Sequence, residues 1–378
     1  MDLPVREFAA SGYRSLQRIV YPVSRLDVLV GANGVGKSNL YRALELLRAA
    51  AANGLGAQLA QEGLEAALWA GPRRSEPVQI GLGVTLASPH RTDATLRYDV
   101  AVGFPPPTAA AFQLEPQIKT ERLTHATSQR KVVLAERDGP SVMARGEDGR
   151  PATVEIDLLA SETMLGRLED PSRYPALDLL RRTLLEWRFY HDLRTDPGSP
   201  LRRPCTAVAA PNLASDGSNL AAVFATLAHI RGDTAELDAL IERAFPGAKL
   251  VVPTPDATAS FGLRLPDFPR RVFDAAELSD GTLRFLALAG ALMAYRLPPF
   301  VALNEPESSL HPDLMEPLGA LIAKASERTQ VWLVTHSERL AAAVEASGAG
   351  AVRTVLKRNG ATAIEGLTPF GAFRDDED

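Results

Sequence analysis

The spacing of apolar residues changes several times along the chain, and each change predicts a different kind of structure. Residues 26–30 form a continuous apolar run, which predicts a buried strand, and residues 38–50 repeat leucine and alanine on one face of a helix. Between residues 77 and 157 apolar and polar positions alternate with a period near two, which predicts an antiparallel β lobe. Helical spacing returns between residues 158 and 272, where we expect an inserted helical lobe.

The last part of the chain alternates strands with helices. Apolar strands are predicted at residues 300–303 and 331–335, and helices are predicted at 281–295, 312–327 and 337–345. This alternation predicts a mostly parallel central sheet flanked by helices, as in α/β folds. We therefore expect five parts, with the bounds 1–76, 77–157, 158–272, 273–370 and a disordered acidic tail at 371–378. The first and fourth parts would together form one lobe.

Composition and charge narrow the class of protein. The chain of 378 residues can bury a large core, and 46% hydrophobic and 23% charged residues are ordinary for a globular protein. A net charge of −5 argues against coating of nucleic acid but leaves room for a local basic surface. The single cysteine, Cys205, excludes an internal disulfide framework. Because the sequence shows no signal-peptide core and no apolar stretch of membrane-spanning length, we expect a cytoplasmic protein with no membrane partner.

The most specific motif lies near the N-terminus. Residues 31–38 read GANGVGKS and fit the phosphate-binding pattern G-x-x-x-x-G-K-[ST] at every fixed position, between a predicted strand and a predicted helix. The glycines let backbone N–H groups point at one anion, Lys37 would reach the β- and γ-phosphates, and the Ser38 hydroxyl would bind Mg²⁺. We expect a nucleoside triphosphate site, with the phosphate-binding residues Gly31, Asn33, Gly34, Gly36, Lys37, Ser38 and Asn39.

Three later segments carry further candidate chemistry. The strand at 300–303 runs into the sequence NEPE at residues 304–307, which is an acidic cluster at a strand end. In α/β nucleotide sites, acidic groups at the carboxyl ends of strands handle metal and water. The strand at 331–335 is followed by His336, and Ser279 and Gly281 open an apolar helix whose N-terminus is a second anion-binding corner.

In this order, the segments resemble the motifs of ABC-type ATPases, and within them the RecF/SMC-like branch of bacterial ATPases. The sequence LSDGT at 278–282 is similar to the ABC signature, NEPE at 304–307 with LHP at 310–312 is similar to the Walker B strand and D-loop, and His336 is similar to the switch histidine. SGYRSL at 11–16 also resembles that branch. The resemblance covers both ends of the chain and implies a P-loop NTPase with an ABC-type ATPase head.

The resemblance further implies a catalytic homodimer, because in such ATPases the signature of one protomer closes over ATP held by the phosphate loop of the other. Ser279 and Gly281 would therefore act in trans. Glu305 would polarise the attacking water, and His336 would contact the γ-phosphate.

Some positions depart from the pattern or are left open by it. Asn304 stands where these ATPases usually have a carboxylate that supports Mg²⁺, so we expect weaker Mg²⁺ dependence and slow turnover. Arg14 would reach the nucleotide, or it is an exposed loop arginine. The Q-loop could lie at Gln58, Gln61 or Gln79.

The expected function is ATP binding and slow hydrolysis that closes a homodimeric clamp on a partner. Duplex DNA in repair or recombination is one candidate partner. The candidate contacts are two basic groups, unless nearby acids neutralise them: lysines and arginines at 119, 122, 130, 131 and 137, and arginines at 181, 182, 188, 194, 202 and 203. The alternative is an ATP-gated switch that controls an effector protein, such as a nuclease or toxin in phage defence. A transporter ATPase subunit is disfavoured, because the segment between Lys37 and Ser279 is longer than that function needs.

Overall fold

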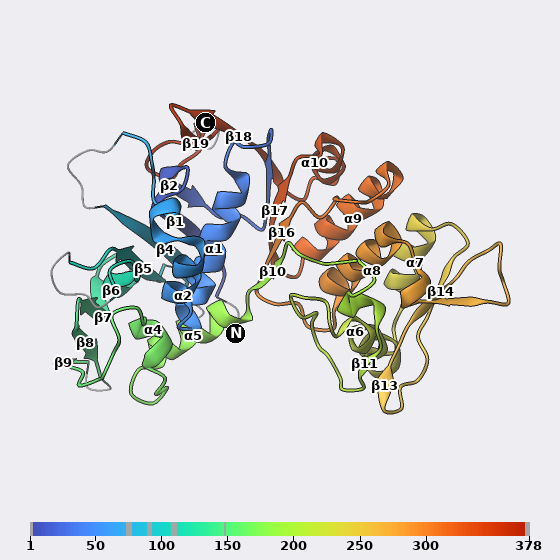
Figure 1. Cartoon of the computed structure of the whole chain (residues 1–378), viewed down its shortest axis with the longest axis horizontal. Helices are drawn as coiled ribbons and strands as arrows, with labels where there is room; N and C mark the ends of the chain where they lie inside the picture. The colour runs from blue at the N-terminus through green and yellow to red at the C-terminus, as the bar shows by residue number, and fades with distance from the viewer. Residues whose placement is uncertain (1–2, 73–77, 89–92, 107–111, 147–148, 375–378) are drawn as a thin grey trace. The chain divides into compact units, whose positions relative to one another are not determined.

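A computed structural model describes residues 3–72, 78–88, 93–106, 112–146 and 149–374 (Figure 1). The chain divides into two compact units, each built from segments that are far apart in sequence. Unit 1 comprises Met1–Ser24, Gly31–Trp187 and Arg353–Asp378, and unit 2 comprises Arg25–Val30 and Arg188–Val352. The boundary expected between residues 76 and 77 lies outside the described residues.

Unit 1 is built on an antiparallel sheet of eight strands in the order β2-β1-β4-β5-β6-β7-β8-β9. Its strands are β1 (Val5–Tyr13), β2 (Leu16–Pro22), β4 (Gln79–Ala87), β5 (Thr95–Gly103), β6 (Gln117–Ala126), β7 (Lys131–Asp138), β8 (Ser141–Arg145) and β9 (Pro151–Thr153). The alternation seen in the sequence buries every second residue, as with Ile80, Leu82 and Val84 on β4.

Five helices belong to unit 1, and α1 is the central one among those described. They are α1 (Lys37–Ala51), α2 (Leu55–Glu62), α3 (Leu64–Ala67), α4 (Met164–Arg167) and α5 (Pro175–Glu186). Helix α1 contacts β1 and β4 of the sheet and also packs against α2, α4 and α5 (Figure 1). Its apolar face, which includes Leu40, Leu44 and Leu47, is fully buried as its spacing predicts.

The C-terminal end of the described chain also packs into unit 1. Strands β18 (Ala351–Arg358) and β19 (Ala361–Ile364) form a hairpin, and β19 contacts β2. Beyond the hairpin, Phe373 is only 3% exposed; its ring meets Tyr21 edge-on at 5.6 Å and lies under the Arg353 guanidinium. The disordered tail expected at 371–378 was therefore placed too early, because this aromatic contact anchors residues 371–374. Residues 375–378 lie outside the described residues.

Unit 2 contains a parallel sheet in which β10 (Arg188–Tyr190), β16 (Phe300–Asn304), β17 (Gln330–Thr335) and β3 (Leu26–Val30) lie side by side in that order. Residues of β16, β17 and β3 are almost all buried, as expected of parallel strands covered on both faces. The pairing aligns the carboxyl ends of these strands, since Thr335 pairs with Val30 and Val334 pairs with Asn304.

Helices and short strands complete unit 2. The helical segments are η1 (Pro200–Arg202), α6 (Leu220–Thr226), η2 (Leu227–Arg231), α7 (Ala235–Ala244), η3 (Ala275–Glu277), α8 (Asp280–Met293), η4 (Pro312–Leu314), α9 (Met315–Ser326) and α10 (Glu338–Glu345). Short antiparallel pairings join β11 (Cys205–Thr206) to β13 (Thr258–Ala259), and β14 (Gly262–Arg264) to both β12 (Lys249–Val251) and β15 (Val272–Asp274). One core cluster buries residues from α8, α9 and the parallel strands together. None of the helices in the described parts of the chain combines the length and apolar character that crossing a bilayer requires.

Candidate functional site

The phosphate-binding motif occupies the turn between strand β3 and helix α1. Strand β3 ends at Val30, and α1 begins at Lys37 with Gly36 as its N-cap. The backbone is left-handed at Gly34 (φ 79°) and Gly36 (φ 102°), a conformation that residues with a side chain rarely adopt. The backbone path therefore requires Gly34 and Gly36, two of the three glycines in this loop.

A row of hydroxyl and amide groups lies under the loop. A Cβ on Gly36 would fall 1.9 Å from Thr362 Oγ1 and 2.4 Å from Ser15 Oγ. The Asn39 amide donates to Ser15 Oγ at 2.7 Å, Ser15 Oγ and Thr362 Oγ1 are 2.6 Å apart, and Thr362 Oγ1 donates to the Val35 carbonyl at 2.9 Å. Thr362 could not be predicted from the sequence, because it lies 326 positions after Gly36, on β19.

The ammonium group of Lys37 is held over the loop. Lys37 is 4% exposed, and its Nζ donates to the carbonyls of Gly31 at 2.6 Å and Ala32 at 2.9 Å. Ser38 and Asn33 are exposed at the mouth of the same loop. A buried cation, a helix N-terminus and a glycine-lined turn fit a phosphate group, and Ser38 offers a free hydroxyl oxygen of the kind that Mg²⁺ binds.

Arg14 is engaged elsewhere in unit 1. It has a left-handed backbone (φ 46°), and its guanidinium lies 2.8 Å from Glu62 Oε2, which also accepts a hydrogen bond from the Tyr13 hydroxyl at 3.1 Å. This pair borders a polar hollow of about 370 Å³ whose lining includes Gln58 and Gln61. Contact of Arg14 with a nucleotide, and the position of a Q-loop, stay predictions.

In unit 2 the acidic cluster lies at the end of β16. Glu305 has a left-handed backbone (φ 49°), and its N–H donates to the Val334 carbonyl at 2.8 Å, so the strand pairing ends at this residue. Arg284 of α8 donates to the carbonyls of Glu305 and Pro306, each at 3.3 Å. Burial lowers the pKa of Arg284, against the opposing pull of Glu307, Asp192 and Glu305. A strained, tethered backbone thus fixes the Glu305 carboxylate at the strand end.

Glu307 joins the ends of β16 and β17. Its carboxyl oxygen Oε1 accepts hydrogen bonds from the Thr335 hydroxyl at 2.5 Å and from the His336 N–H at 3.1 Å. The ring atom Nδ1 of His336 lies 3.2 Å from the same oxygen and 3.9 Å from Glu305 Oε2. The sequence predicted Glu305 and His336 as site residues and gave Glu307 no role. The feature that could have identified Glu307 is its position, because it is a second carboxylate two residues after Glu305 at the same strand end.

Two oxygen atoms at this strand end lack a hydrogen-bond partner among the described residues, namely Oδ1 of Asn304 and Oε2 of Glu307. Buried acceptors without partners are uncommon and costly, and in many proteins such atoms serve a bound ion or water. The Asn304 oxygen suits the role of accepting a hydrogen bond from a metal-bound water, without adding negative charge.

The signature-like loop is fixed from within unit 2. The Ser279 side chain caps α8 by accepting from the Thr282 N–H at 3.2 Å, and a Cβ on Gly281 would lie 2.9 Å from the Ser309 carbonyl. Arg202, whose side chain is 11% exposed, donates to the carbonyls of Ala276 and Leu278 at 3.0 and 2.7 Å and pairs with Asp280 at 2.6 Å. Arg202 thus holds the loop in place, a role that the sequence did not reveal.

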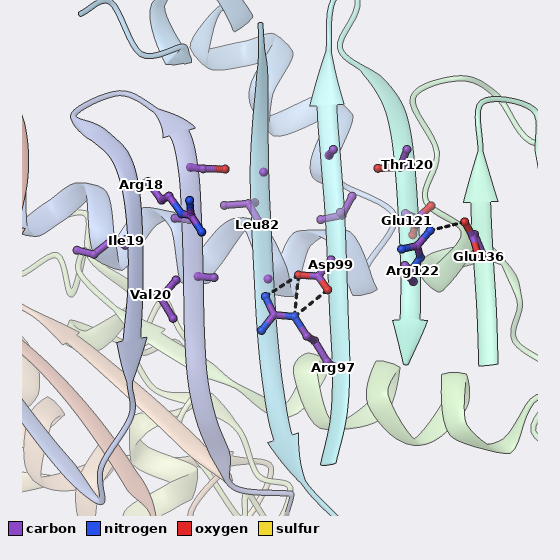
Figure 2. Close-up of a pocket in the computed structure, with 17 residues that line it drawn as sticks. Arg18, Ile19, Val20, Leu82, Arg97, Asp99, Thr120, Glu121, Arg122 and Glu136 are labelled. Carbon is purple, nitrogen blue, oxygen red and sulfur yellow. Dashed lines mark hydrogen bonds and ion pairs between the residues drawn. The ribbon is translucent and has the colours of Figure 1, made fainter. Parts of the chain in front are cut away.

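Other candidate surfaces have little free positive charge. A groove of about 420 Å³ lies on the sheet of unit 1, where Arg97 turns to Asp99 at 2.9 Å and Arg122 to Glu136 at 2.6 Å (Figure 2). Four arginines of the second group predicted as DNA contacts are also paired, in Arg181–Glu169, Arg182–Asp178, Arg194–Asp196 and Arg202–Asp280. These pairs reduce the positive potential available to a phosphate backbone.

Comparisons with known proteins agree with the geometry at the level of the fold. The chain matches the family model described as "AAA domain, putative AbiEii toxin, Type IV TA system" over residues 28–81 and 221–342. These two segments hold the phosphate loop, the signature-like loop, the acidic strand end and His336. No curated protein matches the chain in sequence.

Two solved structures extend the comparison to nearly the whole chain. One is an SMC head bound to the C-winged helix domain of ScpA, at 16% identity and a TM-score of 0.54, covering 96% of this chain and 97% of that chain. The chain has the fold of an SMC head domain. The other is the Smc head domain with an extended coiled coil bound to the C-terminal domain of ScpA from Pyrococcus furiosus, at 15% identity, a TM-score of 0.52 and coverages of 96% and 95%. The predicted P-loop NTPase fold is confirmed at this level, and the RecF-like branch stays a prediction.

Proposed function

We propose that this protein binds ATP at the loop formed by residues 31–38 and hydrolyses it slowly. The observation that carries the proposal is the loop geometry, in which two left-handed glycines and a buried Lys37 form an anion cradle at the start of α1. The sheet register adds support, because Gly31, Glu305 and His336 each follow the aligned ends of three adjacent parallel strands.

In this proposal each side chain has a defined task. Lys37 neutralises the β- and γ-phosphates, Glu305 accepts a hydrogen bond from the attacking water, and His336 contacts the γ-phosphate end of the nucleotide. Mg²⁺, held by the Ser38 hydroxyl and through a bound water by Asn304, would neutralise phosphate charge. The amide at position 304 brings no charge to that water, and this is the physical reason for expecting slow turnover.

We further propose that ATP joins two copies of the chain into a homodimer. Each chain carries one phosphate loop and one signature-like loop, and Ser279 and Gly281 would bind the γ-phosphate held by the other copy. The rigid mounting of the signature-like loop by Arg202 supports this role, since a preorganised helix N-terminus stabilises an anion without reorganisation.

A hydrolysis-deficient variant tests both proposals. Glu305→Gln saturated with MgATP should run as a dimer in light scattering, whereas the same variant with ADP, or with Lys37→Ala added, should stay monomeric. A strictly monomeric Glu305→Gln chain that binds ATP would refute the dimer. A chain that fails to bind ATP in calorimetry would refute the ATPase itself.

The partner of the clamp is a separate proposal. The fold of an SMC head and the sequence resemblance favour duplex DNA in repair or recombination. A second candidate, an ATP-gated switch for an effector protein, is favoured by the family description, which names a toxin, and by the ion-paired arginines. DNA-stimulated ATPase activity and salt-dependent binding of duplex DNA would support the first candidate. ATPase activity indifferent to DNA, with an effector protein that co-purifies in an ATP-dependent manner, would support the second.

A further inference from the structure

Glu307 is a buried carboxylate that the proposed function leaves without a task. It is 6% exposed, and its oxygen Oε2 has no hydrogen-bond partner among the described residues. Burying a carboxylate is costly unless several donors offset the lost hydration. The donors present here are the Thr335 hydroxyl and the His336 backbone N–H, and both point at the other oxygen, Oε1.

The direction of each hydrogen bond around Oε1 can be assigned. The Ser337 N–H donates to Thr335 Oγ1 at 2.9 Å, which leaves the hydroxyl hydrogen of Thr335 for Glu307. The His336 N–H donates to the same oxygen. Both donors need an acceptor, so Oε1 itself carries no hydrogen.

This arrangement constrains the ring of His336. Its Nδ1 lies 3.2 Å from Glu307 Oε1, and an unprotonated Nδ1 would there set its lone pair against that of the carboxylate. We propose that Glu307 is a positioning residue that keeps the His336 proton on Nδ1 and turns Nε2 outward as an acceptor, toward a water at the γ-phosphate of the nucleotide. The other charged groups near the pair are the carboxylate of Glu305 and the guanidinium of Arg284, which is tethered to the Glu305 backbone. The role of Nε2 at the nucleotide rests on the proposed ATPase function, whereas the tautomer and orientation of the His336 ring do not depend on it.

The test compares two variants of Glu307 by histidine NMR of the full chain without nucleotide. Long-range proton–nitrogen spectra report which ring nitrogen of a histidine carries the proton, and the signal among the six histidines is assigned with His336→Gln. In the wild type we expect a protonated Nδ1 at His336. Glu307→Met, which has similar length and no strong acceptor, should shift the proton to Nε2. Glu307→Gln keeps an acceptor oxygen and should preserve Nδ1–H.

Kinetics supplies the second readout. We expect Glu307→Met to lower kcat of the ATPase about 10- to 100-fold with little change in KM for ATP, since the loss concerns orientation rather than binding. Glu307→Gln should recover most of that loss. The matched control is Glu316→Gln, which neutralises an exposed carboxylate of the same unit and should change neither readout.

Two results would overturn the inference. One is a wild-type His336 that carries its proton only on Nε2, and the other is a Glu307→Met chain with unchanged tautomer and kcat. Because the NMR readout needs no nucleotide, it decides the positioning role even if the chain proves to have no ATPase activity. Absence of ATP binding and turnover in the wild type would instead refute the proposed function alone.

Discussion

Replacing Gly36 by alanine should damage unit 1 through two separable effects. The first is backbone strain, because φ is 102° at this position, and holding a residue with a Cβ in such a region costs about 1–3 kcal/mol. The second is a clash, since the new Cβ would lie 1.9 Å from Thr362 Oγ1. To relieve it, Thr362 must rotate and give up its contacts with Val35 and Ser15, which together contribute about 1–3 kcal/mol.

A double-mutant cycle separates the two effects. Thr362→Ala alone should cost about 1–3 kcal/mol, which is the value of its two hydrogen bonds. In that background Gly36→Ala should cost the backbone strain and the remaining 2.4 Å contact with Ser15 Oγ but no longer the clash with Thr362 Oγ1, so the pair should show a coupling of about 1–3 kcal/mol in favour of the double variant. The measurement is the free energy of unfolding from urea titrations, followed by circular dichroism.

Gly34→Ala is the matched control. Gly34 is also left-handed (φ 79°), but a Cβ there would meet no atom within 4 Å. This variant should cost the strain alone, and Thr362→Ala should not rescue it. If Gly36→Ala costs the same free energy of unfolding with and without the Thr362 hydroxyl, the clash does not contribute to that cost. The argument that Thr362 excludes a side chain at position 36 is then wrong.

Three further predictions concern the candidate site. Lys37→Met should abolish ATP binding in calorimetry, because it removes the ammonium group that lies over the loop at the carbonyls of Gly31 and Ala32; retained affinity would refute the phosphate role. Arg202→Met should lower the free energy of unfolding by about 3 kcal/mol, whereas Asp280→Asn, which changes a side chain that is 62% exposed, should cost less than about 1 kcal/mol; equal costs would contradict the role of Arg202 in holding the signature-like loop. Asn304→Asp should raise both Mg²⁺ affinity and kcat, and an unchanged pair of values would remove the explanation of slow turnover.

Local patterns in the sequence were sufficient to predict much of the fold. The phosphate loop, the period-two strands of unit 1 and the parallel strands of unit 2 follow from spacing that depends only on neighbouring residues. Short strand β8 was not predicted, because five residues carry too little periodicity to stand out. The anchored residues 371–374 were missed because the partner of Phe373 is Tyr21, at the other end of the chain.

The residues that hold the candidate site in place were the least predictable. Thr362, Arg202 and Glu307 act through hydrogen bonds to backbone or hydroxyl groups that are between 28 and 327 positions away. A hydroxyl or guanidinium has no periodic signature, and its partner depends on the register of elements that meet only in the folded chain. Sequence motifs thus identified the groups expected to touch ATP, while the groups that orient them required the structure.

The amide at position 304 and the buried carboxylate at position 307 can be understood as one arrangement of charge. An aspartate at 304 would add a third carboxylate to the strand end that already holds Glu305 and Glu307, with the Arg284 guanidinium as a nearby cation. Asn304→Asp should therefore destabilise the apo chain by like-charge repulsion, even where it assists Mg²⁺ binding. Adding Glu307→Gln restores the original number of carboxylates and should recover the apo stability, while its amide oxygen still accepts hydrogen bonds and keeps the His336 ring oriented. If the double variant is no more stable than Asn304→Asp alone in urea unfolding, the two positions do not share one electrostatic environment.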